Sequence, residues 1–165
     1  MIKTKIVLTN GKSFNTDLDE KTQMGQYFKL YELANNKGNK TQVQYVISDK
    51  TQKLVAGLDE LRSKLGKPIT VNSCYRQKQY NASVGGDANS AHLQGYAADL
   101  KFPKLTDSYY ATIKKNWQVI CYNSGVYGAI NRYTNGVHVE MYTNECFGTK
   151  TEFTERNYVG KKGDW

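Results

Sequence analysis

The apolar residues of the chain recur with helical spacing in two stretches. Before Gly66, four leucines lie three or four residues apart: Leu54, Leu58, Leu61 and Leu65. Ser48 or Asp49 can cap the start of this stretch, and Gly66 can end it in a left-handed conformation. Over Asp107–Asn123 one face is apolar and a glycine follows: Tyr110, Ile113, Trp117, Ile120, Cys121 and then Gly125. Both patterns predict amphipathic helices.

Shorter runs of β-branched and aromatic residues predict strands. Residues 2–8 and 13–15 flank Asn10-Gly11, a strong turn signal, and predict an N-terminal hairpin or strand. Four further runs have strand character, the last two joined by the turn-rich stretch 131–136: residues 69–73, Tyr96–Phe102, Val126–Ile130 and Val137–Tyr142. Polar and small residues predict loops over 34–42 and 82–95. Helices packed on one side of a small, mostly antiparallel sheet would give an α+β domain.

The length of the chain fits one domain. With 165 residues we expect a single domain over 1–165, with 1–24 as an N-terminal extension or hairpin, and a monomer. The apolar run Ile6–Leu8 is far shorter than a signal-peptide core, and no run approaches the roughly 20 residues that span a bilayer. We therefore expect no membrane span and a protein made in the cytoplasm.

The formal net charge of +8 would attract an anionic partner, which leaves nucleic acid, anionic membrane and anionic cell wall open. The lysines are spread along the chain rather than gathered in one arm, so the basic surface fits an anionic wall polymer better than nucleic acid. Cys74, Cys121 and Cys146 are odd in number and far apart, and they match neither a disulfide framework nor a paired metal knuckle. One disulfide remains open.

Both histidines of the chain have features that favour a metal site. His92 is followed seven residues later by Asp99, and Gly95 between them permits a tight turn. His138 lies on the predicted strand Val137–Tyr142, with Glu140 on the same strand face. Two imidazoles and one carboxylate are a common ligand set for a catalytic zinc, which keeps a fourth position for water.

Each of these residues also has an ordinary structural interpretation. A lone histidine is more often a surface or core residue than a ligand, and an aspartate near a strand end is often a cap. Asp99 lies within an apolar strand, however, between Ala98 and Leu100. A buried carboxylate needs a partner or a metal, which favours the metal site.

Two segments resemble a known family. Residues 73–99 read SCYRQKQYNASVGGDANSAHLQGYAAD, and they closely resemble the D-Ala-D-Ala carboxypeptidase-like zinc peptidases of the M15 family, whose hallmark is S-G-Y-R followed by S-x-H-x-x-G-x-A-x-D. Residues 125–142 are similar to the segment that leads these enzymes to their last zinc histidine. The resemblance covers roughly residues 45–142 and implies an α+β fold of the hedgehog and DD-peptidase type.

By position, the resemblance implies that zinc is held by three side chains: His92, Asp99 and His138. It also implies substrate contacts from Tyr75, Arg76 and Ser90. Arg76 would hold the substrate carbonyl or a carboxylate, since a guanidinium near the metal can stabilise an oxyanion. A surface salt bridge is the ordinary alternative for Arg76.

The sequence departs from the family in two places. Cys74 stands where glycine is usual, and Gly136 and Asn135 stand where many relatives carry an acidic residue or a histidine. Neither Gly136 nor Asn135 can take a proton from water. Glu140 is the nearest substitute as general base. It could instead orient an imidazole N–H of a zinc ligand.

The residues and the resemblance together predict a zinc-dependent hydrolase of peptidoglycan stem peptides. The family contains D-Ala-D-X carboxy- and endopeptidases as well as L-Ala-D-Glu endopeptidases, and both specificities stay open. We expect a phage lysin that acts on the wall after release through a holin or from the virion. The alternatives are a non-catalytic, zinc-containing wall-binding module of the same fold and a metal-free nucleic-acid-binding domain.

Overall fold

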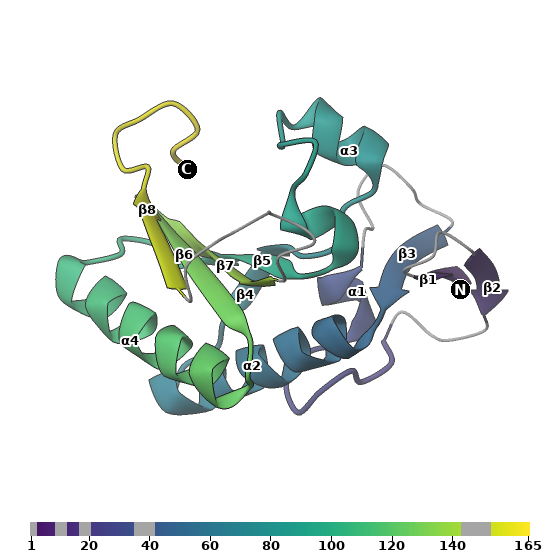
Figure 1. The fold of residues 1–165 in the computed structure, drawn as a ribbon, viewed down its shortest axis with the longest axis horizontal. Coiled ribbons are helices and arrows are strands. Elements are labelled where there is room, and N and C mark those ends of the chain that lie inside the picture. The colour runs from purple at the N-terminus through teal and green to yellow at the C-terminus, as the bar shows by residue number, and fades with distance from the viewer. Residues whose placement is uncertain (1–2, 9–12, 17–20, 35–41, 143–152) are drawn as a thin grey trace.

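The computed structural model describes residues 3–8, 13–16, 21–34, 42–142 and 153–165, leaving aside the side chains of residues 3–8, 13–16 and 42–44. The chain forms two sheets with helices packed around them (Figure 1). The larger sheet has the strand order β4-β5-β7-β6-β8, and the smaller sheet has the order β2-β1-β3.

The larger sheet is mostly antiparallel, as the sequence predicts. Its strands are β4 (Thr70–Ser73), β5 (Ala97–Lys101), β7 (Gly136–Tyr142), β6 (Tyr127–Tyr133) and β8 (Phe153–Asn157). Only the pair β6 and β8 is parallel. The α+β class with this sheet is therefore confirmed, while β8 is a strand that the sequence pattern did not predict.

Helix α2 (Asp49–Leu65) is the first predicted helix, with Ser48, one of the two candidate residues, as its N-cap and Gly66 at its end. At its start, Ser48 Oγ accepts a hydrogen bond from Thr51 N at 3.2 Å, and Thr51 Oγ1 accepts one from Ser48 N at 2.8 Å. This reciprocal pair satisfies two backbone donors that a helix start would otherwise leave without partners. At its end Gly66 has φ 63°, the left-handed conformation that glycine adopts without strain.

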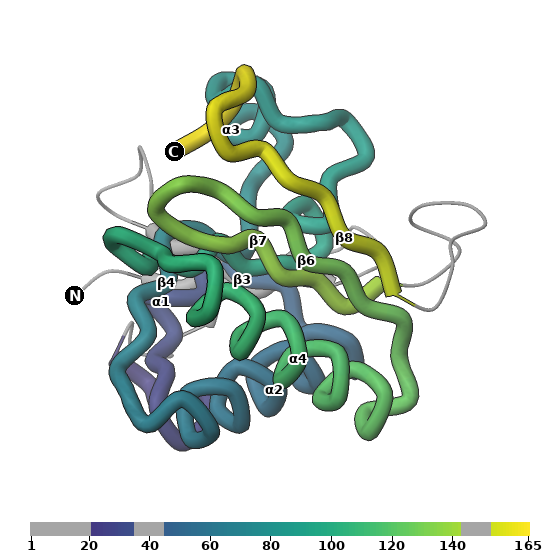
Figure 2. Tube along the Cα trace, turned by 90° about the vertical axis from the view of Figure 1, so that its left-hand side faces the viewer, coloured from purple at the N-terminus to yellow at the C-terminus, as the bar shows by residue number. Residues whose placement is uncertain are grey.

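Helix α4 (Asp107–Asn123) has the predicted bounds, and its five predicted apolar residues are all buried. Helices α2 and α4 lie side by side against one face of the larger sheet (Figure 2). Leu58, Trp117 and Val139, from the two helices and β7, are fully buried between them and the sheet. The core therefore occupies this face of the sheet and leaves the other face for a site.

The smaller sheet includes the predicted N-terminal pair, since β1 (Lys3–Leu8) and β2 (Ser13–Thr16) are antiparallel. Strand β3 (Gln42–Ile47), which the sequence pattern did not predict, runs parallel to β1. The short helix α1 (Leu30–Leu33) buries two leucines in the core. The predicted loop over 34–42 lies mostly outside the described residues.

Two predicted loops are wrong in extent. Within 82–95 the chain forms the end of helix α3 (Lys78–Ser83) and the 3₁₀ turn η1 (Ala91–Gln94), because local hydrogen bonds organise the small residues there. Within 131–136 only residues 134 and 135 connect the strands, since Arg132 pairs with Val137 and Tyr133 with Gly136. This is a two-residue hairpin.

Two of the cysteines are described, and both are buried and free: Cys74 and Cys121. Cys146 lies outside the described residues. Among the described helices, none is both long and apolar enough to cross a membrane.

Gly57 of α2 packs closely against helix α4 and strand β7. A Cβ at this position would lie 2.7 Å from Met141 Cε, 3.2 Å from Ile120 and 3.3 Å from Trp117. We expect Gly57→Leu to lower the free energy of unfolding by about 1–3 kcal/mol, because the extra atoms overfill a packed contact. Ala56→Leu, on the exposed side of the same helix, should change it by about 0.5 kcal/mol or less. Urea unfolding measures both, and equal effects would contradict this packing.

Candidate metal centre

The open face of the larger sheet carries a row of polar side chains that crosses all five strands. The strand register aligns Ser73 with Asp99, Asp99 with His138, His138 with Asn131, and Asn131 with Arg156. Residues directly opposite one another on neighbouring strands point to the same face, with Cβ atoms about 5 Å apart. The sheet itself therefore brings Asp99 of β5 and His138 of β7 together.

His92 reaches the row from outside the sheet. It lies in η1, where Ser90 Oγ accepts a hydrogen bond from His92 N at 3.3 Å, and Gly95 ends the turn with φ 69°. The chain then enters β5 directly at Ala97. This tight connection returns His92 to Asp99, as the spacing of the two residues predicts.

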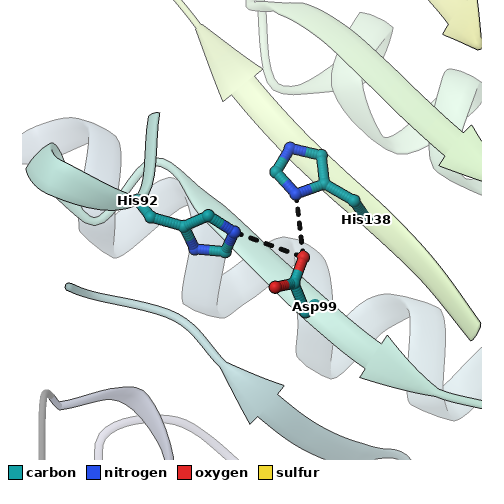
Figure 3. A group of neighbouring side chains, drawn as sticks. All are labelled: His92, Asp99 and His138. Atoms are coloured by element: carbon teal, nitrogen blue, oxygen red, sulfur yellow. Dashed lines mark hydrogen bonds and ion pairs between the residues drawn. The ribbon is translucent and has the colours of Figure 1, made fainter. Parts of the chain in front are cut away.

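The three predicted ligands meet at one point (Figure 3). Asp99 Oδ1 lies 3.2 Å from His92 Nε2 and 2.9 Å from His138 Nδ1. One potential ligand atom of each residue lies within 4.8 Å of those of the other two. Among the described residues, this is the group of histidine, cysteine and acidic side chains whose geometry suits a metal ion.

In each imidazole, the ring nitrogen that does not contact Asp99 has a hydrogen-bond acceptor. His92 Nδ1 lies 2.6 Å from the carbonyl oxygen of Cys74, so this nitrogen carries the proton and donates it. In the neutral ring, Nε2 then presents a lone pair to the Asp99 carboxylate. His138 Nε2 lies 3.0 Å from Glu140 Oε2. Outer partners of this kind fix the ring orientation of metal-binding histidines.

The charges of the cluster favour a cation where the three side chains meet. Burial lowers the pKa of His92, although Asp99 opposes this shift. Burial also disfavours the charged form of His138, but hydrogen bonds to Asp99 and Glu140 outweigh it and raise the pKa of His138 to about 9. Burial alone would raise the pKa of Asp99, yet the two histidines hold it well below its usual range. An ionised carboxylate facing two imidazoles fits a divalent cation.

Arg76 lies next to this cluster, in the loop after β4. Its Nη2 donates to Asp99 Oδ2 at 2.5 Å, and its Nε donates to Ser73 Oγ at 2.9 Å. The side chains of Arg76 and Asp99 are only 15% and 10% exposed, so this is not the surface salt bridge that was the alternative. Arg76 therefore fixes the second oxygen of Asp99 and leaves Oδ1 for the histidines.

The other predicted site residues have different positions. Ser90 and Glu140 line the same cleft as the cluster, whereas Tyr75 is buried and lines a separate recess beside α1 and β4. The structure thus brings Arg76, Ser90 and Glu140 to the three predicted ligands and leaves Tyr75 apart from them.

One wall of the cleft comes from residues that sequence reasoning missed. They belong to β8 and the segment after it: Thr154, Arg156, Tyr158, Lys162, Gly163 and Trp165. This segment is docked, because Asp164 accepts hydrogen bonds from Thr134 N at 2.7 Å and Thr134 Oγ1 at 2.6 Å. The aromatic residues of the stretch 153–165 were the available signal, but nothing local indicates which strand they join.

Gly136 is one of the two positions at which the sequence lacks the acidic residue or histidine of the family. The space that a side chain would occupy there is filled. A Cβ at Gly136 would lie 2.3 Å from the carbonyl oxygen of Leu100 and 2.4 Å from the ring of Trp165. Trp165 also stacks on Tyr133, with ring centroids 5.0 Å apart. No side chain fits at position 136 without displacing this packing.

The fold and the site together are those of an α+β domain with a His-Asp-His cluster in an open cleft. Such a cluster is typical of proteins that bind a single metal ion. The chain belongs to the peptidase M15 family, whose model matches residues 26–140. This finding confirms the family to which residues 73–99 and 125–142 point.

Two individual proteins are also similar. Over 44 residues the chain is 50% identical to the zinc D-Ala-D-Ala carboxypeptidase of Streptomyces albus G, a match that spans 26% of this chain and 17% of that relative. The crystal structure of the Serratia marcescens L-Ala D-Glu endopeptidase ChiX matches with a TM-score of 0.41 and 20% identity, over 58% of this chain and 82% of that chain.

The contact of Gly136 with Trp165 has a measurable consequence. We expect Gly136→Asp to lower the free energy of unfolding by at least about 1–3 kcal/mol, because the side chain overfills a packed site and brings a charge with it. Trp165→Ala in the same chain should recover part of this loss, since the ring is one of the two obstacles. Thermal unfolding of the single and double variants tests the contact, and additive losses would contradict it.

Proposed function

We propose that this chain is a zinc-dependent peptidase that hydrolyses peptide bonds of bacterial peptidoglycan. Membership of a peptidase family and the activity in the name of the Streptomyces albus G relative support the reaction class. The observation that carries the proposal is the convergence of His92, Asp99 and His138 on one point of an open cleft.

Zinc is the cation that the family membership implies, and the side chains fit it. His92 Nε2, Asp99 Oδ1 and His138 Nδ1 are the three ligand atoms that we assign. Two imidazole nitrogens and one carboxylate oxygen suit zinc, and three protein ligands leave one position open to the cleft. When bound, the ion would polarise the substrate carbonyl and make water more acidic.

Arg76 has two tasks in this proposal. It holds Asp99 Oδ2, which orients the carboxylate toward the histidines. A guanidinium carries five N–H groups, and three of those of Arg76 point to Ser73, Asn81 and Asp99. The remaining donors of this cleft-lining residue are available to hydrogen-bond a substrate carbonyl whose oxygen becomes negative during the reaction. Ser90, which lines the same cleft and caps η1, is assigned a substrate contact.

Glu140 is assigned as a positioning residue, with proton transfer as the alternative role. Its Oε2 accepts from His138 Nε2 at 3.0 Å, which turns His138 Nδ1 toward Asp99. Its side chain is 9% exposed and lines the same cleft as the cluster, which supports proton transfer as the alternative role.

The substrate that we propose is the stem peptide, cut at a D-Ala-D-X bond. The name of the Streptomyces albus G relative supports this choice, and an L-Ala-D-Glu bond is the other candidate. The net charge of +8 favours adsorption to an anionic wall. The setting that we propose is a phage lysin, made in the cytoplasm and acting on the wall after release.

A non-catalytic wall-binding module is the second candidate function. The observation in its favour is the glycine at position 136, where Trp165 and Leu100 exclude a proton-accepting side chain. Such a module would bind zinc and peptidoglycan and release no product. Chromatography of wall material after incubation with the protein distinguishes the two functions, because only the peptidase releases products.

The metal assignment predicts the effect of removing one ligand. We expect one zinc per chain in the wild type, and release of new amino or carboxyl ends from purified peptidoglycan that a chelator abolishes and zinc restores. Asp99→Asn should lower zinc affinity by at least about ten-fold and abolish cleavage, because the amide loses the negative charge. Elemental analysis and product chromatography are the measurements.

The matched control for this experiment is Asp49→Asn, which makes the same change at an exposed position of α2. This variant should keep both zinc and activity. Full zinc content in Asp99→Asn would contradict the assigned ligand set. Zinc binding without product on several wall types would contradict the enzyme and support the binding module.

The variant Glu140→Gln distinguishes the two roles considered for Glu140, orientation of the His138 ring and proton transfer. The amide oxygen still accepts from His138 Nε2, so we expect zinc to be retained and kcat to fall by about 10–100-fold. Glu140→Ala should lower zinc affinity as well. A loss of kcat beyond about 1,000-fold in Glu140→Gln, with zinc retained, would instead identify Glu140 as the general base.

A further inference from the structure

The floor of the cleft continues past the metal cluster to a second set of charged residues. From His138 the row of polar side chains runs through Asn131 on β6 to Arg156 on β8. Lys162, in the docked segment that follows β8, lines the same cleft. Arg156 and Lys162 follow the metal cluster in sequence, and the fold brings both of them into its cleft.

The side chains of these two cations take no part in the hydrogen bonds and ion pairs that hold the described part of the fold together. Within the described ranges, the side chains of Arg156 and Lys162 make no hydrogen bond and no ion pair, although the backbone of Arg156 pairs with β6. By contrast, the cleft carboxylates have partners: Asp99 binds Arg76 and the histidines, Glu140 binds His138, and Asp87 accepts from Asn89 N at 2.7 Å. The β8 end of the cleft therefore presents two cationic side chains that have no ion-pair partner in the described part of the chain.

The segment that carries Lys162 is held firmly. Tyr133 stacks on Tyr158 with ring centroids 5.2 Å apart and on Trp165 with centroids 5.0 Å apart. Asn135 N also donates to the carbonyl oxygen of Trp165 at 2.8 Å. A cation on a docked segment costs less conformational entropy on binding than one on a free tail.

The spacing of the strands sets the distance between the two ends of the cleft. β6 and β8 follow β7 in the sheet, so Arg156 lies two strand spacings from His138, or about 10 Å. An extended peptide advances about 3.3 Å per residue. A peptide whose scissile bond lies at His138 would therefore reach Arg156 about three residues away.

We infer that Arg156 and Lys162 bind a carboxylate of the peptide substrate about three residues from the bond that is cut. The inference rests on the proposed peptidase function and names the feature that selects the substrate: an acidic peptide rather than a neutral one. A guanidinium and an ammonium form charge-assisted hydrogen bonds to a carboxylate. A carboxamide in place of the substrate carboxylate is neutral, so these hydrogen bonds become weaker.

The test compares two synthetic stem pentapeptides that end in D-Ala-D-Ala. One carries a free α-carboxylate on its D-glutamyl residue, and the other carries a carboxamide there. We expect the wild type to favour the carboxylate peptide by about ten-fold in kcat/KM. Arg156→Gln and Lys162→Gln should each reduce this preference and together remove it, through loss of activity on the carboxylate peptide alone.

Lys115→Gln is the matched control, because it removes one charge from an exposed position of α4, on the opposite face of the sheet. It should leave the preference unchanged. An unchanged preference in the Arg156→Gln, Lys162→Gln double variant would overturn the inference. So would an equal loss on both peptides, which would indicate general attraction to the wall.

Binding measured by calorimetry keeps this test separate from the proposed function. If neither peptide is cut, the peptidase proposal fails, and the affinities of the two peptides still decide the inference. A ten-fold preference for the carboxylate peptide that disappears in the double variant supports the carboxylate site. Equal affinities in the wild type overturn it.

Discussion

The carboxylate of Asp99 is the interaction on which the rest of the site depends. It lies within β5, between two strands of the larger sheet, and it contacts a side chain from each of three other parts of the chain: Arg76, His92 and His138. A buried carboxylate without partners would cost several kcal/mol. The loop after β4, the turn η1 and strand β7 are thus tied to one charged group.

This arrangement divides the larger sheet into a packed face and a reactive face. Helices α2 and α4 bury apolar residues against one face, which lets the strands hold charged residues in fixed register on the other. The backbone takes part as well, since the carbonyl oxygen of Cys74 orients His92. A substitution of Cys74 that keeps the backbone leaves this contact intact, which explains how the chain tolerates a residue other than glycine there.

The sequence predicted the parts of the fold that have strong local signals. The two long helices lie where the sequence predicts them, because their apolar periodicity and the caps at Ser48 and Gly66 act locally. His92, Asp99, His138 and Glu140 could be named as candidates because few residue types can bind a metal and because residues 73–99 resemble the zinc peptidases. Strands β3 and β8 were missed, since both pair in parallel with strands distant in sequence, and the residues of β8 carry little alternation of their own. The packing of Trp165 on Gly136 is likewise a contact across the fold that no local pattern encodes.

X-ray absorption spectroscopy of the zinc-loaded chain tests the central assignment most directly. The account predicts a shell of nitrogen and oxygen atoms at about 2.0–2.2 Å with the outer scattering of two imidazole rings, and no sulfur. This spectrum should lose one imidazole contribution in His138→Ala. A sulfur shell at about 2.3 Å, or a spectrum without imidazole scattering, would place the metal elsewhere and contradict the account.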